Sequence, residues 1–152
     1  MRLPLLIDST AKTQDSFITE FAMESLLFLA LGGALGALGR FWTGLATTAL
    51  FGSGFPVGTL IVNVAGSFLI GLTASAVAAG RLAPSPWDAL IMQGFCGALT
   101  TFSTFSMDSF RLFREGRMAG AWVNLLLSMA LCLSAAALGF SLLTPAAVPA
   151  HP

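Results

Sequence analysis

Long apolar stretches alternate with short polar segments over most of this chain. The first apolar stretch, residues 25–48, contains a single charged side chain, Arg40. Residues 41–80 hold no charge at all, and this is longer than the roughly 20 residues of one membrane-spanning helix. Glycine and proline at residues 52–56 form a strong turn signal, so the pattern predicts two helices, the second at about residues 57–79.

Two more apolar stretches complete the pattern. A proline-containing loop leads to a third stretch, residues 87–107, and the charged segment 108–117 leads to a fourth, residues 118–144. Each of these stretches is long enough to cross a bilayer. We therefore predict an all-α membrane protein with four transmembrane helices.

The ends of the chain differ from this apolar region. Residues 1–22 mix charged and polar side chains with a few apolar ones, and we expect a polar, disordered extension. Met23 immediately precedes the first apolar stretch, which suggests the hypothesis that it is the true start. Residues 23–144 are expected to form one four-helix channel domain, and residues 145–152 a disordered tail.

The composition supports a membrane protein and excludes several other classes. Hydrophobic residues make up 56% of the chain and charged residues only 9%, against about 25% charged in soluble domains. A net charge of +0 argues against a nucleic-acid partner. Cys96 and Cys132 lie in apolar stretches and are expected to be packing thiols. No nucleophile–base pair is recognisable, so we predict that the protein is not an enzyme.

Basic residues give only a weak preference for one orientation. One side of the predicted membrane domain carries Arg81, and the other carries Arg111, Arg114 and Arg117. Insertion in both directions is therefore credible. Four thin helices enclose little interior, so we also expect an oligomer, with small residues four apart at helix contacts. These pairs are Gly32 with Gly36, Ser67 with Gly71, and Gly116 with Gly120.

The third stretch contains a segment, residues 94–105, that is poorly suited to a continuous helix. Gly97 weakens a helix interior, and the hydroxyls of Thr100 and Thr101 compete for backbone hydrogen bonds. Freed backbone groups at bilayer depth are tolerated only where protein or a water-filled cavity meets them. The segment therefore predicts either a helix break near residues 97–100 that holds an ion, or a packing seam of small and hydroxylated residues.

Three further polar side chains lie inside the predicted membrane helices. Asn63 is on the second helix, and Asn124 and Ser128 share one face of the fourth because they are four residues apart. Amides and hydroxyls donate hydrogen bonds, so they suit an anion, but they equally suit hydrogen bonds between helices. Both interpretations stay open at this point.

Arg40 and a phenylalanine pair are further candidates for an ion pathway. Arg40 falls short of, or near, the far interface of the first predicted span, where it either extends toward the interface or gathers anions in a vestibule. Phe102 and Phe105 are three residues apart, so they are near one helix face, and their ring edges are electropositive. Ordinary packing is the alternative for this pair.

The chain resembles the Fluc (CrcB) fluoride channel family in three blocks, residues 32–41, 58–68 and 94–105. The resemblance implies an antiparallel, dual-topology homodimer with two pores in a bacterial-type inner membrane. It also implies a structural sodium ion (Na+) at the dimer centre, bound by the backbone carbonyls of Gly97 and Thr100. The expected function is passive, fluoride-selective export that reduces fluoride toxicity.

By the same resemblance, five residues would line the ion pathway and Arg40 would be the vestibule cation. The pathway residues are Asn63, Phe102, Phe105, Asn124 and Ser128. Family members often have tyrosine at the position of Asn124, which is one departure. The main alternative is a small multidrug-resistance-type, proton-coupled exporter, but this predicts a glutamate embedded in the first helix, and Glu24 is at its edge.

Overall fold

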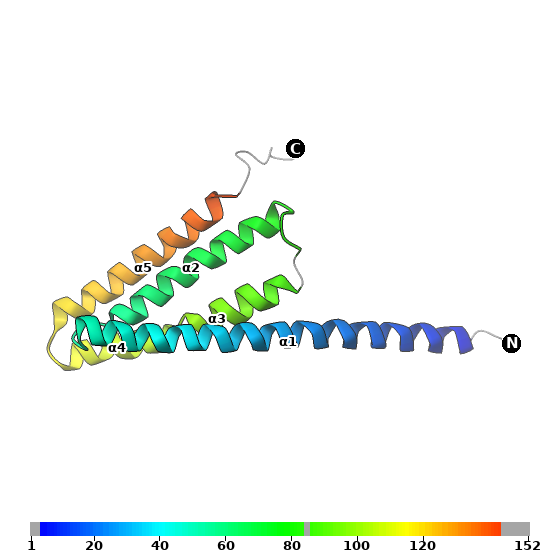
Figure 1. Cartoon of the computed structure of the whole chain (residues 1–152), viewed down its shortest axis with the longest axis horizontal. Helices are drawn as coiled ribbons and strands as arrows, with labels where there is room; N and C mark the ends of the chain where they lie inside the picture. The colour runs from blue at the N-terminus through cyan, green and yellow to red at the C-terminus, as the bar shows by residue number, and fades with distance from the viewer. Residues whose placement is uncertain (1–3, 84–85, 144–152) are drawn as a thin grey trace.

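The described part of the chain is helical throughout its regular elements (Figure 1). The computed structural model describes residues 4–83 and 86–143. This confirms the all-α prediction for these residues. In chain order the helices are α1 (Pro4–Phe51), α2 (Val57–Ala78), the π-helix η1 (Ala89–Cys96), the short α3 (Gly97–Leu99), α4 (Phe102–Arg114) and α5 (Met118–Ser141).

Three of these helices contain a segment long and apolar enough to cross a membrane. The segments are Met23–Phe51, Val57–Ala78 and Met118–Ser141. They correspond to the first, second and fourth predicted spans, and they make this a membrane-helical protein. The third predicted span is divided among η1, α3 and α4, so it is not one continuous helix.

Helix α1 is much longer than predicted. It begins at Pro4 and has 48 residues, so the expectation of disorder is wrong for the extension from residue 4 onward, while residues 1–3 are outside the described residues. No glycine or proline occurs between residues 5 and 31, so nothing in the sequence stops the helix. At 1.5 Å per residue α1 is about 72 Å long, and Figure 1 shows it projecting past the other helices. The predicted tail, residues 145–152, also lies outside the described residues.

Glycines on α1 allow it to touch the backbone of η1. A Cβ added at Gly32 would be 2.1 Å from the carbonyl oxygen of Leu90, and one added at Gly36 would be 2.2 Å from that of Phe95. Only glycine fits at such distances. The predicted small-residue contact at these two positions is therefore confirmed, and it packs α1 directly against the broken segment.

A second glycine contact joins α2 to α5, which are side by side in Figure 1. A Cβ on Gly71 would be 2.1 Å from the Ala136 oxygen, and one on Gly139 would be 2.2 Å from the Phe68 oxygen. The third predicted pair behaves differently. Gly116 has φ +71° in the turn after α4, where its missing side chain permits a left-handed backbone.

Most of the charged segment 108–117, which separates the third and fourth apolar stretches, is helical. Helix α4 continues to Arg114, and Arg111 and Arg114 occupy its last turn. Positive charge there is favourable because the carbonyl end of a helix carries partial negative charge. The two arginines therefore stabilise the last turn of α4, which lies beyond the third apolar stretch of the sequence.

Candidate ion pathway

The third predicted span is broken at Thr100 and Thr101. Thr100 has φ −81° and ψ 157°, and Thr101 has φ −155° and ψ 115°, both in the extended region. Gly97 keeps helical angles, φ −60° and ψ −37°, so it lies just before the break. The break therefore occurs at the C-terminal edge of the predicted window, where the hydroxylated residues begin.

Asn63 on α2 holds the broken backbone in place. The Thr101 amide donates to Asn63 Oδ1 at 2.7 Å, and Asn63 Nδ2 donates back to the Thr101 carbonyl at 3.1 Å. A single side chain thus satisfies both backbone groups of a residue that is only 7% exposed. The hydrogen bond between helices, one of the two interpretations of Asn63, is present.

These bonds take two amides away from their usual helical acceptors. In a continuous helix the Thr101 amide would donate to the Gly97 carbonyl, and the Thr104 amide would donate to the Thr100 carbonyl. Instead the first donates to Asn63, and the second donates to Thr101 Oγ1 at 3.1 Å. The carbonyls of Gly97 and Thr100 therefore lack their helical donors, and such oxygens are suitable ligands for a hard cation.

Thr101 has a structural role at the break that the sequence analysis did not assign. Its hydroxyl caps the N-terminus of α4, because it accepts the Thr104 amide. A threonine just before a renewed helical segment is a recognisable capping signal, so this role was accessible from sequence. Thr101 thus both ends the broken segment and starts the next helix.

A hollow of about 240 Å³, here called the phenylalanine hollow, lies beside the break. Phe102 and Phe105 both line it, with ring centroids 5.7 Å apart and ring planes inclined by 47°. Phe102 is 76% exposed and Phe105 only 7%, so the two rings differ sharply in environment. The complete lining is Asn63, Ser67, Ile70, Thr100, Thr101, Phe102, Phe105, Ser128, Met129 and Cys132.

The structure brings four of the five predicted pathway residues to this hollow, but not Asn124. The Asn124 side chain is 1% exposed and packs against α4, where its Nδ2 donates to Ser109 Oγ at 2.9 Å. Ser109 Oγ in turn donates to the Phe105 carbonyl at 2.8 Å. Among the described residues, Asn124 Oδ1 and the buried Ser128 Oγ have no hydrogen-bond partner.

Arg40 lines a second hollow of about 250 Å³, here called the arginine hollow. It lies in the interior of the span Met23–Phe51. Within residues 4–83 and 86–143 its guanidinium forms no hydrogen bond or ion pair, which is unusual for a charge at membrane depth. The lining consists of Arg40, Gly44, Gly58, Thr59, Val62, Thr101 and Thr104. Thr101 thus lines both hollows.

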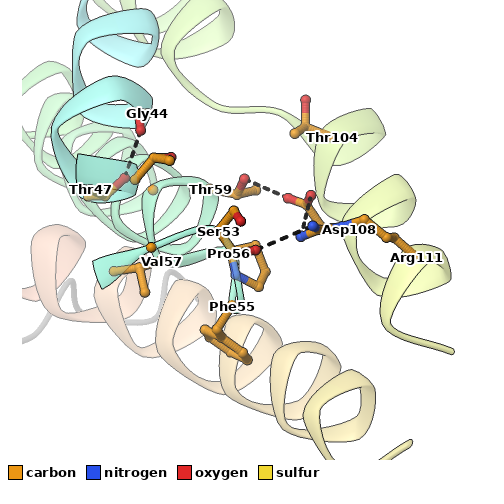
Figure 2. A pocket seen from close by; sticks show the side chains of 13 residues that line it. Gly44, Thr47, Ser53, Phe55, Pro56, Val57, Thr59, Thr104, Asp108 and Arg111 are labelled. Atoms are coloured by element: carbon orange, nitrogen blue, oxygen red, sulfur yellow. Dashed lines mark hydrogen bonds and ion pairs between the residues drawn. The ribbon is translucent and has the colours of Figure 1, made fainter. Parts of the chain in front are cut away.

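A third hollow of about 260 Å³ extends from the arginine hollow to the loop between α1 and α2 (Figure 2). The two share Gly44, Gly58, Thr59 and Thr104.

A polar network that the sequence did not reveal lines this third hollow (Figure 2). Thr59 Oγ1 donates to Asp108 at 2.8 Å, Arg111 is 3.9 Å from Asp108, and Arg111 donates to the Ser53 carbonyl at 3.3 Å. The network links α2, α4 and the α1–α2 loop. It arises because α4 continues beyond the predicted third span and carries Asp108 inward.

The polar groups around the hollows are mostly uncharged oxygen and nitrogen groups. The histidine, cysteine, aspartate and glutamate side chains of the described residues form no cluster of three or more. The hollows are lined instead by backbone, hydroxyl and amide groups and by the guanidinium groups of Arg40 and Arg111, and such groups suit a hard monovalent cation and a small anion at separate points.

The sequence matches the model of the CrcB-like protein family, Camphor Resistance (CrcB), over residues 27–140. A protein of Vibrio cholerae serotype O1 named "Fluoride-specific ion channel FluC" is 50% identical over 113 residues, which cover 74% of this chain and 90% of the relative. The identically named protein of Vibrio parahaemolyticus is 51% identical, over 76% of this chain and 91% of the relative. That of Shewanella amazonensis is 46% identical, over 80% of this chain and 97% of the relative. The chain therefore belongs to the CrcB family.

Proposed function

We propose that this protein is a fluoride-selective channel that lets fluoride leave the cytoplasm passively. The observation that carries the proposal is the pair of hollows that meet at Thr101, one with an unpaired arginine and the other with an amide, hydroxyls and two phenylalanines. Relatives that are about half identical in sequence are named fluoride-specific ion channels. The family match supports a channel and not an enzyme.

The lining chemistry suits a small, strongly hydrated anion. A selective pore must replace the hydration shell with donors spaced along a narrow path. Arg40 would concentrate the anion, Asn63 and Ser128 would supply polar contacts, and the electropositive edges of Phe102 and Phe105 would hold it weakly. Weak successive sites permit exit as well as entry.

The proposal includes an antiparallel, dual-topology homodimer in a bacterial-type inner membrane, with the segment η1–α3–α4 as a fourth crossing. Phe102 is 76% exposed in the single chain although it lines the hollow, so a second copy would complete the wall there. On α4, Phe102, Met107 and Phe110 are large apolar side chains that are exposed in the single chain, and a second copy would cover them.

The Gly97 and Thr100 carbonyls would bind a structural sodium ion between two such subunits. Both lack their helical donors, and carbonyl oxygen is a hard ligand, so the residues present fit this cation. When bound, sodium would supply positive charge that offsets part of the cost of an anion at bilayer depth.

The small multidrug-resistance-type exporter is not favoured by the family match. Such an exporter predicts a glutamate embedded in the first helix, whereas Glu24 is exposed at the start of the first span. The proposed flow is therefore passive, and fluoride would leave down its own gradient and so reduce fluoride toxicity.

The test is release of fluoride from liposomes loaded with potassium fluoride, followed by an electrode after valinomycin is added. We expect rapid fluoride release and no chloride release under matched conditions. Absence of fluoride release from protein that is dimeric and supplied with sodium would overturn the channel proposal. Release of both anions would overturn the selectivity.

A further inference from the structure

Ser109 connects the two helices that carry Phe105 and Asn124. It is 4% exposed, and its hydroxyl takes part in two hydrogen bonds at once. It accepts from Asn124 Nδ2 at 2.9 Å and donates to the Phe105 carbonyl at 2.8 Å. A buried chain of hydrogen bonds therefore runs from α5 to the backbone of a residue in the hollow wall.

The oxygen of the Asn124 side-chain amide is buried without a hydrogen-bond donor from the described part of the chain. Asn124 Oδ1 has no donor among the described residues, and Ser128 Oγ, one turn away on the same helix face, has no partner either. A buried acceptor without a donor is costly. Fluoride only accepts hydrogen bonds, so it cannot satisfy Oδ1, whereas an amide N–H in the same place would suit it.

We propose that Ser109 is a positioning residue that holds the Asn124 amide in two alternative orientations during fluoride passage. In the orientation seen, Nδ2 donates to Ser109, and Ser109 donates to Phe105. In the other, the amide is turned by 180°, the Ser109 hydroxyl donates to Oδ1, and the Nδ2 hydrogens take the place of Oδ1. The two ends of an amide are nearly equal in volume and a hydroxyl rotates freely, so the exchange needs no repacking.

The inference rests on the proposed fluoride channel and couples the anion to Phe105. Turning the amide withdraws the Ser109 hydrogen from the Phe105 carbonyl. The backbone behind one ring of the phenylalanine hollow thus loses a hydrogen bond when a fluoride-binding N–H becomes available one helical turn from Ser128, which lines that hollow.

Fluoride release from liposomes tests this relay, the hydrogen bonds that connect Asn124 through Ser109 to the Phe105 carbonyl, with variants at Ser109. S109A removes the hydroxyl, and we expect release to slow by about tenfold, the effect of one lost hydrogen bond. S109T keeps a hydroxyl that bonds the same carbonyl, so it should restore most of the rate. S109C, with a weak donor and acceptor of similar size, should be intermediate, and it keeps the test valid if S109A does not assemble.

A double-mutant cycle separates the relay from a purely structural role. If Ser109 acts through Asn124, S109A should have no further effect in an N124A background. Wild-type release from S109A, or the same slowing in both backgrounds, would overturn the inference.

Nuclear magnetic resonance gives an independent readout because the chain contains only two asparagines, Asn63 and Asn124. In 15N-asparagine-labelled protein, fluoride but not chloride should shift the Asn124 side-chain signals, which N124A identifies, and S109A should abolish the shift. If fluoride does not shift the Asn124 side-chain signals, the relay is overturned. A different result would overturn only the channel proposal: the wild type releases no fluoride, yet fluoride still shifts its Asn124 signals and S109A abolishes that shift.

Discussion

Replacing Asn63 by alanine tests whether this one side chain maintains the helix break. The substitution removes both partners of the Thr101 backbone, the acceptor at 2.7 Å and the donor at 3.1 Å. The Thr101 amide has an alternative acceptor, because the Gly97 carbonyl is in the correct position if the helix closes. The Thr101 carbonyl would likewise accept from the Phe105 amide in a closed helix, so the cost of the substitution is the loss of the two hydrogen bonds to Asn63.

The magnitude follows from those two hydrogen bonds. Each contributes about 0.5–1.5 kcal/mol, so losing both lowers the ratio of folded to unfolded protein by roughly 5- to 140-fold. Closing the helix would also return the Gly97 carbonyl to an amide and remove one proposed sodium ligand. Fluoride release should therefore fall by more than the loss of stability alone explains.

Two assays on the same preparation separate these effects. Thermal unfolding of the purified dimer measures stability, and fluoride release from liposomes measures function. Ile61→Ala is a matched control, because Ile61 is on the same helix and 44% exposed. Asn63→Ala protein with the thermal stability and release rate of the Ile61→Ala control would refute the argument that Asn63 holds the break open.

Three further perturbations address the remaining parts of the site. Phe102→Ile should slow fluoride release while the dimer persists by size-exclusion chromatography, since an electropositive ring edge is lost; normal release would refute that role. Gly66→Ala should abolish release, because its Cβ would be 2.2 Å from Thr100 Cγ2 and displace the break; an active variant would show that the break can shift without harm. Arg40→Gln should reduce release most at low ionic strength, where charge is least screened, and equal loss at all salt concentrations would contradict a role in gathering anions.

The break and its partner were the parts of the site most accessible from sequence. Polar residues inside apolar stretches are rare, so Asn63 and the threonines near residue 100 stand out without any structure. Their interaction could not be deduced, because it joins residues far apart in the chain. The extended backbone at Thr101 is set by that contact and not by local propensity.

Asn124 and Arg40 show where helix periodicity stops being informative. The spacing of Asn124 and Ser128 places both on one face, but only packing decides that Asn124 meets Ser109 while Ser128 reaches the hollow. The sequence placed Arg40 short of, or near, a membrane interface by its distance from Leu26; the helix continues to Phe51, and the residues that surround Arg40 come also from α2 and from Thr101 and Thr104, which no count along one helix reveals.

The unbroken helix α1 offers a site at which a rigid marker for electron microscopy can be attached to this small protein. A 15.8 kDa membrane protein offers few features for aligning particles in electron micrographs. Because α1 is one helix from Pro4 and its glycines lock it against η1, a helical fusion at its N-terminal end would keep a fixed orientation relative to the helix break. A rigid marker attached there would reveal directly whether the two copies in a particle point in opposite directions.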